Sequence, residues 1–400
     1  MRLAILIAWI LPLFVGFLWR SHRKHSNPLT LTKFHKIRAL LDPPGISMMT
    51  LLRSRAVPNE RLLRAFGIHN STFTSSSEEV HSVFTKQVLG CLRNLDSPHR
   101  WKEFKALIHS AVDFYLPDGS VPGDYAAYMQ AIVFTTILAV LFDFGPPFPD
   151  AVNVREVTEG INTLWLHSKT SSSHPSKLTP TLSRINQHLQ SWIPANPMNP
   201  FRNNPLEILL PAYETMWRLC AHTYVYVEGI PENTSTFIDF FDNPTSTQFR
   251  LSRDLKTPSA HNVIQEVLRL HPPTKRIKRS SDVLGLNWAQ RMFAAAGLRP
   301  IVFASNIVAA DIEALQRSPV WDPLPHDFDA MRHQTSTEVQ KQCFMPFGLG
   351  PLRCVASAWA PRMAGMLVAG LAKRADVQLI RAGSPGGRDG WEGWKIGRKE

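Results

Sequence analysis

The stretch of this sequence best suited to chemistry is a glycine-containing loop that ends in a cysteine. It runs from Phe347 to Cys354 as Phe-Gly-Leu-Gly-Pro-Leu-Arg-Cys, and an apolar, helix-forming run follows from Val355. Glycines let a backbone pass close to a flat ligand, and the N-terminus of a following helix favours a thiolate. The loop therefore predicts a cysteine that ligates the iron of a haem. The alternative is a buried structural cysteine after an ordinary glycine turn.

A second segment, residues 204–226, predicts a long apolar helix with an acid and an alcohol near its centre. Pro205 suits the start of a helix. Pro211 removes one backbone hydrogen bond, which predicts an opening or kink just before Glu214 and Thr215. A carboxylate beside a hydroxyl can pass protons to a bound ligand, but taken alone such a pair usually marks only polar helix surface.

A third signal is the pair Glu266 and Arg269, three residues apart in the segment 261–273. Residues at this spacing share one helical face, so the segment predicts a helix with a local ion pair. On a surface such a pair is worth only about 0.2–0.5 kcal/mol, which is the alternative to a structural role.

These motifs, in this order, resemble those of the cytochrome P-450 family. The family's cysteine loop has a phenylalanine seven residues before the ligand and a glycine four before it, as Phe347, Gly350 and Cys354 do here. The family usually places Arg or His two residues before the cysteine to meet a haem propionate. This chain has Leu352 there, and Arg353, displaced by one, is the expected cofactor contact.

The resemblance also assigns roles on two predicted helices. Ala212, Glu214 and Thr215 match the small residue, acid and threonine of the family helix that crosses the haem, and the last two would be catalytic through proton delivery. Trp101 and Lys105, within the helix predicted over 97–112, have the spacing of a tryptophan and arginine that bind a propionate. Lysine lacks the arginine fork, and the alternative is a packed tryptophan beside a solvated basic face.

In the family, the Glu-x-x-Arg pair is completed by an arginine from a later loop. Arg332, four residues after Phe328, occupies that place in this chain. The resemblance therefore implies a structural triad of Glu266, Arg269 and Arg332 that holds the haem-side scaffold.

As a whole, the resemblance implies a mainly α fold with a small β component. It implies haem b ligated by Cys354, dioxygen as co-substrate, and electrons that a separate reductase draws from NADPH, since no nucleotide or flavin motif is visible here. A small lipophilic molecule would be hydroxylated, epoxidised or desaturated, in the manner of fungal enzymes of specialised metabolism. Two alternatives stay open, a haem-thiolate isomerase or dehydratase without a reductase, and a degenerate haem-binding protein.

The first residues of the chain predict a membrane anchor. Residues 3–19 are apolar over nearly the length of a membrane span, and basic residues follow at 20–25. We expect a retained single-pass anchor within 1–26, with the rest of the chain in the cytosol at the endoplasmic reticulum. A cleavable signal peptide is the rival.

The remaining chain is expected to hold one catalytic unit. Residues 27–60 are predicted as a linker and the start of the catalytic part, and 61–400 as the haem-thiolate domain. The apolar run 125–142 predicts a buried core helix, and the Ser/Thr/Pro-rich stretch 168–180 an exposed loop. Glycine-rich residues 383–387 show little strand character, so the C-terminal hairpin of the family is expected to be shortened.

Composition excludes several other classes of protein. Four scattered cysteines fit neither a disulfide framework nor a zinc ribbon. The formal charge of +12 is spread along the chain without a nucleic-acid-binding signature, so no nucleic acid partner is expected. A membrane surface or an acidic redox partner accounts for the charge more simply.

Overall fold

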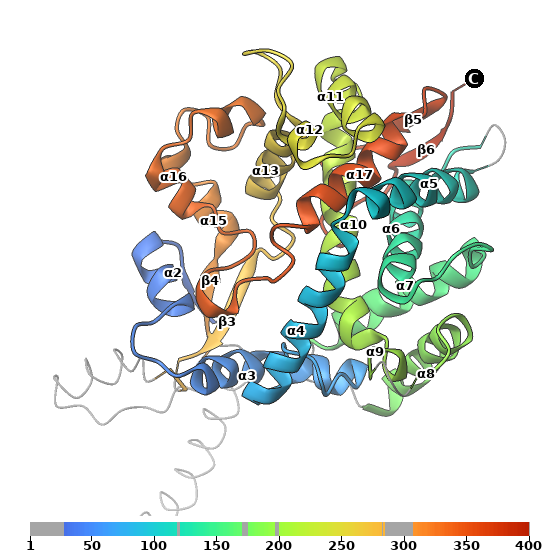
Figure 1. Ribbon diagram of the computed structural model, residues 1–400. Coiled ribbons are helices and arrows are strands. Elements are labelled where there is room, and N and C mark those ends of the chain that lie inside the picture. Colours follow the sequence, from blue (N-terminus) through green and yellow to red (C-terminus); the bar gives the residue numbers. More distant parts are fainter. Residues whose placement is uncertain are drawn as a thin grey trace, which may run out of the picture.

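The structure is a computed structural model that describes residues 28–117, 121–169, 175–196, 200–281, 283–284 and 307–399. The predicted anchor, residues 3–19, lies outside the described residues. Helices dominate the described fold and strands are short, as the sequence predicts (Figure 1). The elements in chain order are β1 (Leu29–Leu31), α2 (Phe34–Leu41), α3 (Met48–Phe66), α4 (Glu78–Leu95), α5 (Pro98–Tyr115), β2 (Gly123–Asp124), α6 (Tyr125–Phe142), α7 (Ala151–His167), α8 (Pro175–Trp192), α9 (Pro200–Asn203), α10 (Leu206–Val227), α11 (Pro231–Asp242), α12 (Ser246–Arg250), α13 (Ala260–Leu270), β3 (Arg276–Ser280), β4 (Ile307–Asp311), α15 (Ile312–Gln316), η1 (Pro319–Trp321), η2 (Ala330–Gln334), α16 (Glu338–Cys343), η3 (Gly350–Leu352), α17 (Ala360–Ala372), β5 (Val377–Ile380) and β6 (Lys395–Arg398).

Most of the long helices begin at a residue whose side chain accepts a backbone N–H of the first turn. This cap satisfies donors that a helix leaves without an internal partner. The capping residues are Ser47, Ser77, Ser97, Asp124, Asp150 and Ser259.

The helix α6 confirms the predicted core helix over residues 125–142. Its 18 residues are apolar enough to cross a membrane, but 83% of them are buried inside the protein, because α5, α7 and α10 surround it. The exposed loop predicted over 168–180 is wrong in its second half, since α8 begins at Pro175. Proline suits the first turn of a helix, where its missing N–H is not needed.

Apolar side chains form two separate cores. The large core fills the space among α4 to α13, α17 and the last two strands. The small core joins α2, the start of α3, β4, α15 and Met345. Figure 1 shows α2, α15, α16 and the β3–β4 sheet to one side of the helical body. The two cores are therefore two packed units that share one chain.

Two three-stranded sheets complete the fold. In the first, β1 pairs parallel with β4, and β4 pairs antiparallel with β3. The segment predicted as a linker and catalytic start, 27–60, thus supplies an edge strand, and α3 runs through its predicted end at residue 60.

The second sheet contains a C-terminal hairpin. Strands β5 and β6 pair antiparallel, and β2 pairs with β6. The expectation of a tail with little strand character is therefore wrong on either side of residues 383–387. The glycines occupy the connection between the strands, where a turn needs them: Gly383 and Gly390 have φ of 66° and 90°.

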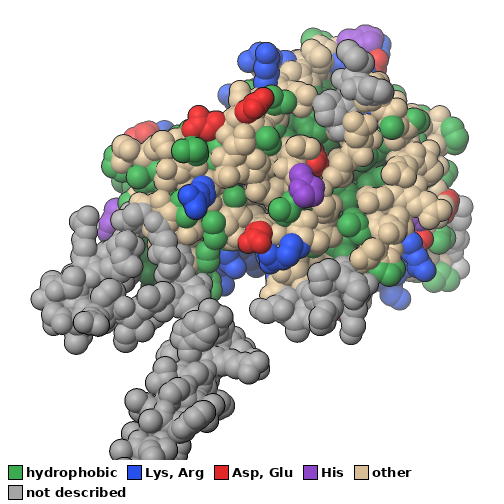
Figure 2. All heavy atoms as spheres, turned by 90° about the horizontal axis from the view of Figure 1, so that it is seen from below, with side chains coloured by type: hydrophobic (Ala, Val, Ile, Leu, Met, Phe, Trp, Pro, Cys, Tyr) green, Lys and Arg blue, Asp and Glu red, His purple; other side chains and the backbone are tan. Residues whose placement is uncertain are grey.

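Charged side chains on the face seen in Figure 2 are mixed in sign. Basic groups there are separated by acidic, apolar and neutral ones.

Candidate functional site

Glu266 and Arg269 form an ion pair in the interior of the protein. Both side chains are 0% exposed. Nη2 of Arg269 lies 2.7 Å from Oε1 of Glu266, and Nε lies 2.8 Å from Oε2. A two-pronged contact of this kind is strong and fixes the relative orientation of both groups. The pair is therefore buried structure rather than the surface pair that was the alternative.

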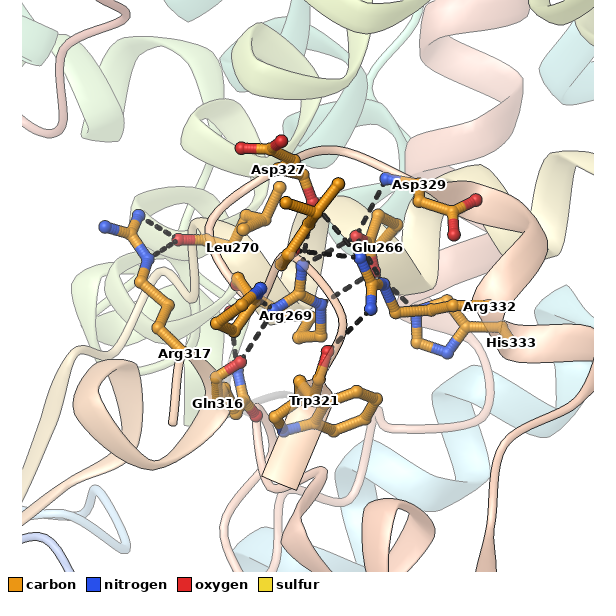
Figure 3. A network of polar contacts seen from close by, with 12 residues as sticks. Glu266, Arg269, Leu270, Gln316, Arg317, Trp321, Asp327, Asp329, Arg332 and His333 are labelled. Carbon is orange, nitrogen blue, oxygen red and sulfur yellow. Dashed lines mark hydrogen bonds and ion pairs between the residues drawn. The ribbon is translucent and has the colours of Figure 1, made fainter. Parts of the chain in front are cut away.

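Three further donors reach the same carboxylate from η2 and from the residue just before it (Figure 3). Nε of Arg332 lies 3.2 Å from Oε1, and Nε2 of His333 lies 2.9 Å from Oε2. The backbone N–H of Asp329 also donates to Oε1, at 3.0 Å. The three side chains predicted as a triad, Glu266, Arg269 and Arg332, thus meet in the structure, with His333 as a fourth member.

The remaining N–H groups of the two arginines hold the surrounding backbone. Arg269 donates to the carbonyls of Gln316 and Pro325, at 2.8 and 2.6 Å. Arg332 donates to the carbonyl of Trp321 at 2.8 Å. Buried carbonyls need such donors, so the loop between α15 and η2 is tied around one carboxylate.

The network reaches the cysteine loop through Gln316, which is fully buried. Its Nε2 donates to the carbonyl of Leu268 at 2.9 Å. Its Oε1 accepts the N–H of Met345 at 2.8 Å, two residues before Phe347. The start of the cysteine loop is therefore held by Gln316, whose backbone carbonyl also accepts a hydrogen bond from Arg269.

The cysteine loop is a tight turn that only glycine permits. Gly348 and Gly350 have φ of 74° and 71°. A Cβ atom at Gly350 would also lie 2.8 Å from the side chain of Asp42. The loop closes with a hydrogen bond of 2.9 Å from the N–H of Cys354 to the carbonyl of Phe347. The glycines thus permit a backbone turn that other residues rarely adopt.

The loop lies across the junction of the two cores. Phe347 packs against the large core, whereas Leu349 and Leu352 pack against the small one. Leu352 occupies the position where the cytochrome P-450 family usually has a propionate contact, and here its side chain packs against the small core. Cys354, at the end of the loop, is exposed, so its sulfur is accessible to a ligand.

The protein around Cys354 does not by itself stabilise a thiolate. Although one side of the residue is open, burial on the others raises the pKa of the thiol, and the N–H of Ala356 and the charge of Arg353 only partly offset that rise. The helix α17 begins at Ala360, after a turn, so the predicted stabilisation by a helix N-terminus next to Cys354 is wrong. A helix dipole acts only within about its first turn. Deprotonation would therefore depend on a bound metal.

The helix α10 is buried on all sides except one stripe. Pro211, Ala212, Thr215, Arg218 and Tyr226 are partly exposed, and most other residues of the helix are buried. Their spacing of three or four residues, with one longer step, places them on one face. The threonine and the small residue before it thus lie on the open side of this helix.

The predicted opening at Pro211 is wrong, because α10 continues as one helix from Leu206 to Val227. Proline removes a single backbone hydrogen bond here, and burial among α6, α13 and α17 offsets that loss. The hydroxyl of Thr215 donates to the carbonyl of Pro211 at 3.3 Å.

Glu214 is buried beside Thr215 and is paired with an arginine that sequence reasoning missed. Nη2 of Arg388, from the loop between β5 and β6, contacts Oε2 of Glu214. The same guanidinium lies 4.5 Å from the Trp165 ring centroid and donates to Oδ1 of Asn162 at 2.9 Å. A C-terminal loop therefore supplies the counter-charge of the acid on α10.

The other predicted contacts of the cofactor have protein partners. The indole N–H of Trp101 donates to Asp96 at 2.9 Å, and Nζ of Lys105 lies 3.5 Å from Asp242. Arg353 lines a surface groove beside the cysteine loop together with Arg362. Trp101 and Lys105 thus contact two different acids, Asp96 and Asp242.

Two buried arginines have no acidic partner among the described residues. Arg55 of α3 is 7% exposed and donates to Thr72, and Arg279 of β3 is 4% exposed and donates to the carbonyl of Lys278. Nε of each lacks a partner. Burial and the neighbouring charge of Arg279 lower the pKa of Arg55 to about 9, and burial lowers that of Arg279 to about 10.

A ligand with carboxylates fits these two guanidiniums, and haem carries two propionates. The structure therefore fits haem on two counts: an accessible cysteine on a glycine loop, and orphaned cations that an anion would satisfy. One sequence signal existed for Arg55, which follows Leu51 by four residues on the buried side of α3. Arg279 lies in a short strand with no comparable signal.

The described chain has the fold of the cytochromes P450. CYP175A1 from Thermus thermophilus superimposes with a TM-score of 0.58 at 14% identity, covering 88% of this chain and 82% of that one. A 6-coordinated cytochrome P450, also from Thermus thermophilus, gives 0.57 at 15% identity, over 88% of this chain and 86% of that one.

Sequence similarity is limited to part of the chain. It is 29% identical to the sterol 14alpha-demethylase of Mycobacterium tuberculosis over 149 residues, which is 36% of this chain and 30% of that protein. The enzyme of the same name from Mycolicibacterium vanbaalenii is 30% identical over 125 residues, 30% of this chain and 25% of that protein. No protein-family model matches the chain.

The variant Glu266→Gln should lower the free energy of unfolding by about 3–5 kcal/mol, because it leaves buried arginines without their counter-charge. Urea unfolding monitored by circular dichroism measures this. The matched control is Glu338→Gln, whose carboxylate is 78% exposed beside Lys341, and it should cost less than about 1 kcal/mol. Equal effects of the two substitutions would contradict the role given to Glu266.

The same contact predicts a dependence of stability on pH. Burial alone raises the pKa of Glu266, but hydrogen bonds from Arg269 and His333 outweigh it and lower the pKa from 4.5 to about 2. A depressed pKa stabilises the fold above the unfolded value and loses that contribution as pH falls. Wild-type stability should therefore fall between about pH 4.5 and 2 more steeply than that of Glu266→Gln.

Proposed function

We propose that this chain is a haem-thiolate monooxygenase whose iron is held by Cys354. The observation that carries the proposal is the accessible cysteine on a glycine loop that the buried Glu266 network positions, within a cytochrome P450 fold. The partial similarity to enzymes named sterol 14alpha-demethylase supports the same reaction class.

The residues that would hold haem come from three parts of the chain. Cys354 would ligate the iron, and the N–H of Ala356 would donate to its sulfur. Arg55 and Arg279 would bind the propionates through the N–H groups that lack partners. When bound, haem supplies the redox chemistry that places one oxygen atom of dioxygen in the substrate and releases the other as water.

That reaction consumes two electrons and two protons, and the open face of α10 would deliver the protons. Thr215 presents its hydroxyl on the exposed stripe, and Glu214 lies behind it in contact with Arg388. A carboxylate that is held in place can relay protons to a neighbouring hydroxyl. Arg388 would then act as a positioning residue for Glu214. The electrons would come from a separate NADPH-dependent reductase.

The substrate proposed is a small lipophilic molecule. The relatives are named sterol 14alpha-demethylase, and a sterol is lipophilic, which supports this class of substrate. A role in specialised metabolism, of the kind found in fungi, rests on the helix motif around Ala212. The runner-up functions are a haem-thiolate isomerase or dehydratase, which would turn over without a reductase, and a haem-binding protein without turnover.

The variant Cys354→Ala should abolish the shifted absorption band that reduced, carbon monoxide-treated haem-thiolate protein shows. The matched control is Cys91→Ala, a partly buried cysteine of α4, which should keep the band. Persistence of the thiolate band in Cys354→Ala would show that another residue ligates the iron, and would overturn the proposal.

The variant Thr215→Ala should load haem normally, because the hydroxyl it loses lies on a partly exposed stripe and contributes only about 0.5–1.5 kcal/mol of stability. It should release peroxide in place of product, because that hydroxyl is the proposed proton donor. Glu266→Ala should instead fail to retain haem. Haem content and peroxide release, measured with the same reductase, separate the two roles. Normal haem content in Glu266→Ala together with haem loss in Thr215→Ala would reverse the assignment.

We further propose that residues 3–19 anchor the protein in the endoplasmic reticulum membrane, with the described fold in the cytosol. This rests on the apolar run and the basic residues after it. A chain without residues 1–26 should remain haem-loaded and move to the soluble fraction. Retention on membranes after a high-salt wash would require another membrane contact and contradict the anchor.

A further inference from the structure

A groove separate from the cysteine loop runs along the C-terminal half of α10. It has a volume of about 410 Å³. Its walls come from α10, the segment after α13, α15 and the glycine-rich residues 384–387. None of its lining residues belongs to the cysteine loop. A volume of about 300–1,000 Å³ is usual for a small-molecule site.

Positive charge predominates in this groove. Arg218, Lys275 and Arg317 are cations, and Glu313 is the one carboxylate among its lining residues. Nζ of Lys275 and Nη2 of Arg317 lie 3.0 and 3.3 Å from the same oxygen of Glu313. One carboxylate shared by two cations leaves a formal excess of positive charge along the wall.

Backbone carbonyls hold the guanidiniums of Arg218 and Arg317 in place and leave some of their N–H groups without a partner among the described residues. Arg218 donates from Nε to the carbonyl of Glu214 at 2.8 Å and from Nη1 to that of Pro273 at 2.7 Å. Its Nη2 is 4.0 Å from the Glu214 carboxylate, too far for a hydrogen bond. Nε of Arg317 donates to the carbonyl of Leu270 at 2.9 Å, as Figure 3 shows. Fixed guanidiniums with spare N–H groups are prepared for an oxyanion.

A buried imidazole lines the same groove. His222 is 4% exposed, and its Nδ1 has no partner among the described residues. Its ring stacks on His271 with centroids 4.2 Å apart, and His271 is bound to Tyr226. Burial is the largest cause that lowers the pKa of His222 and of His271, and neighbouring positive groups lower it further. The pKa of His271 falls to about 4. A neutral His222 can donate an N–H to an anion, which would satisfy its unpaired nitrogen.

We propose that this groove binds a small organic oxyanion, a carboxylate or a phosphate, between Arg218, Lys275 and Arg317. The proposal goes beyond the monooxygenase function and does not depend on it. Arg218 follows Thr215 by three residues on the same open face of α10, a rise of about 4.5 Å. A bound anion would therefore lie beside the proposed reaction site, either as a free ion or as the charged end of a lipophilic substrate.

Isothermal titration calorimetry of the full chain tests the proposal with inorganic phosphate, octanoate and neutral octanol. We expect saturable 1:1 binding of octanoate that octanol does not displace. Competition by phosphate would show that a free ion suffices, and its absence that the site takes the charged end of an amphipathic molecule. Both results support an oxyanion site. Binding of neither anion, or equal binding of octanol at the same site, would overturn it.

Two variants with opposite expected effects show whether the groove is responsible. Lys275→Gln removes a 56% exposed cation that is paired with Glu313, and it should weaken binding roughly threefold to tenfold. Glu313→Gln frees both cations and should tighten binding by a similar factor. The control Lys256→Gln removes an exposed cation that does not line the groove, and it should change nothing. Unchanged affinity in both groove variants would refute the site even if the protein binds anions, and it would leave the assignment of Cys354 untouched.

Discussion

The charge of Glu266 has no access to water, and this constraint fixes the path of the chain between α15 and η2. A carboxylate that is 0% exposed is tolerated only if hydrogen bonds and opposite charges from the protein replace its hydration. Two arginines, a histidine and a backbone N–H do so: Arg269 comes from α13, and the other three come from residues 329–333. The charges of the arginines are in turn satisfied by carbonyls of the loop after α15. Compensation of one buried charge, together with the packing of Trp321 and Phe328, therefore sets the path of this loop.

The same network explains why the cysteine loop has a defined place. The side chain of Gln316 donates a hydrogen bond to α13 and accepts one from the N–H of Met345, so it links the helix to the start of the loop. The glycines then permit a turn whose side chains pack in both cores. A loop held at its start and packed on both sides loses little entropy when a ligand binds its end. Cys354 is thus exposed at a rigid point, which is the property a metal ligand needs.

Two buried arginines and one groove carry positive charge that acids among the described residues do not fully match. Arg55 and Arg279 are buried without a carboxylate among the described residues, and the groove beside α10 has three cations for one Glu313. Burying unpaired guanidiniums is unfavourable in a protein that binds nothing. Anion binding would offset that cost, which supports our proposals of propionates for Arg55 and Arg279 and of an oxyanion for the groove. Glu214 is the contrasting case, because Arg388 already compensates it.

The sequence by itself determined the elements that depend on local physics. Apolar periodicity and helix-start signals predicted α5, α6, α10 and α13, and the spacing of Glu266 and Arg269 predicted that they share a helical face. Glycines at the cysteine loop predicted a backbone that other residues cannot adopt. Each of these follows from neighbours a few positions apart and does not depend on the rest of the fold.

Which distant groups meet depends on the tertiary structure. His333 on Glu266, Arg388 on Glu214, and Arg279 near Arg55 join segments tens to hundreds of residues apart. Packing also overruled local signals, since α10 passes through Pro211 and α17 begins beyond the reach of Cys354. The reason is that burial and charge compensation are properties of a place in the fold, and several segments have to arrive there before either acts.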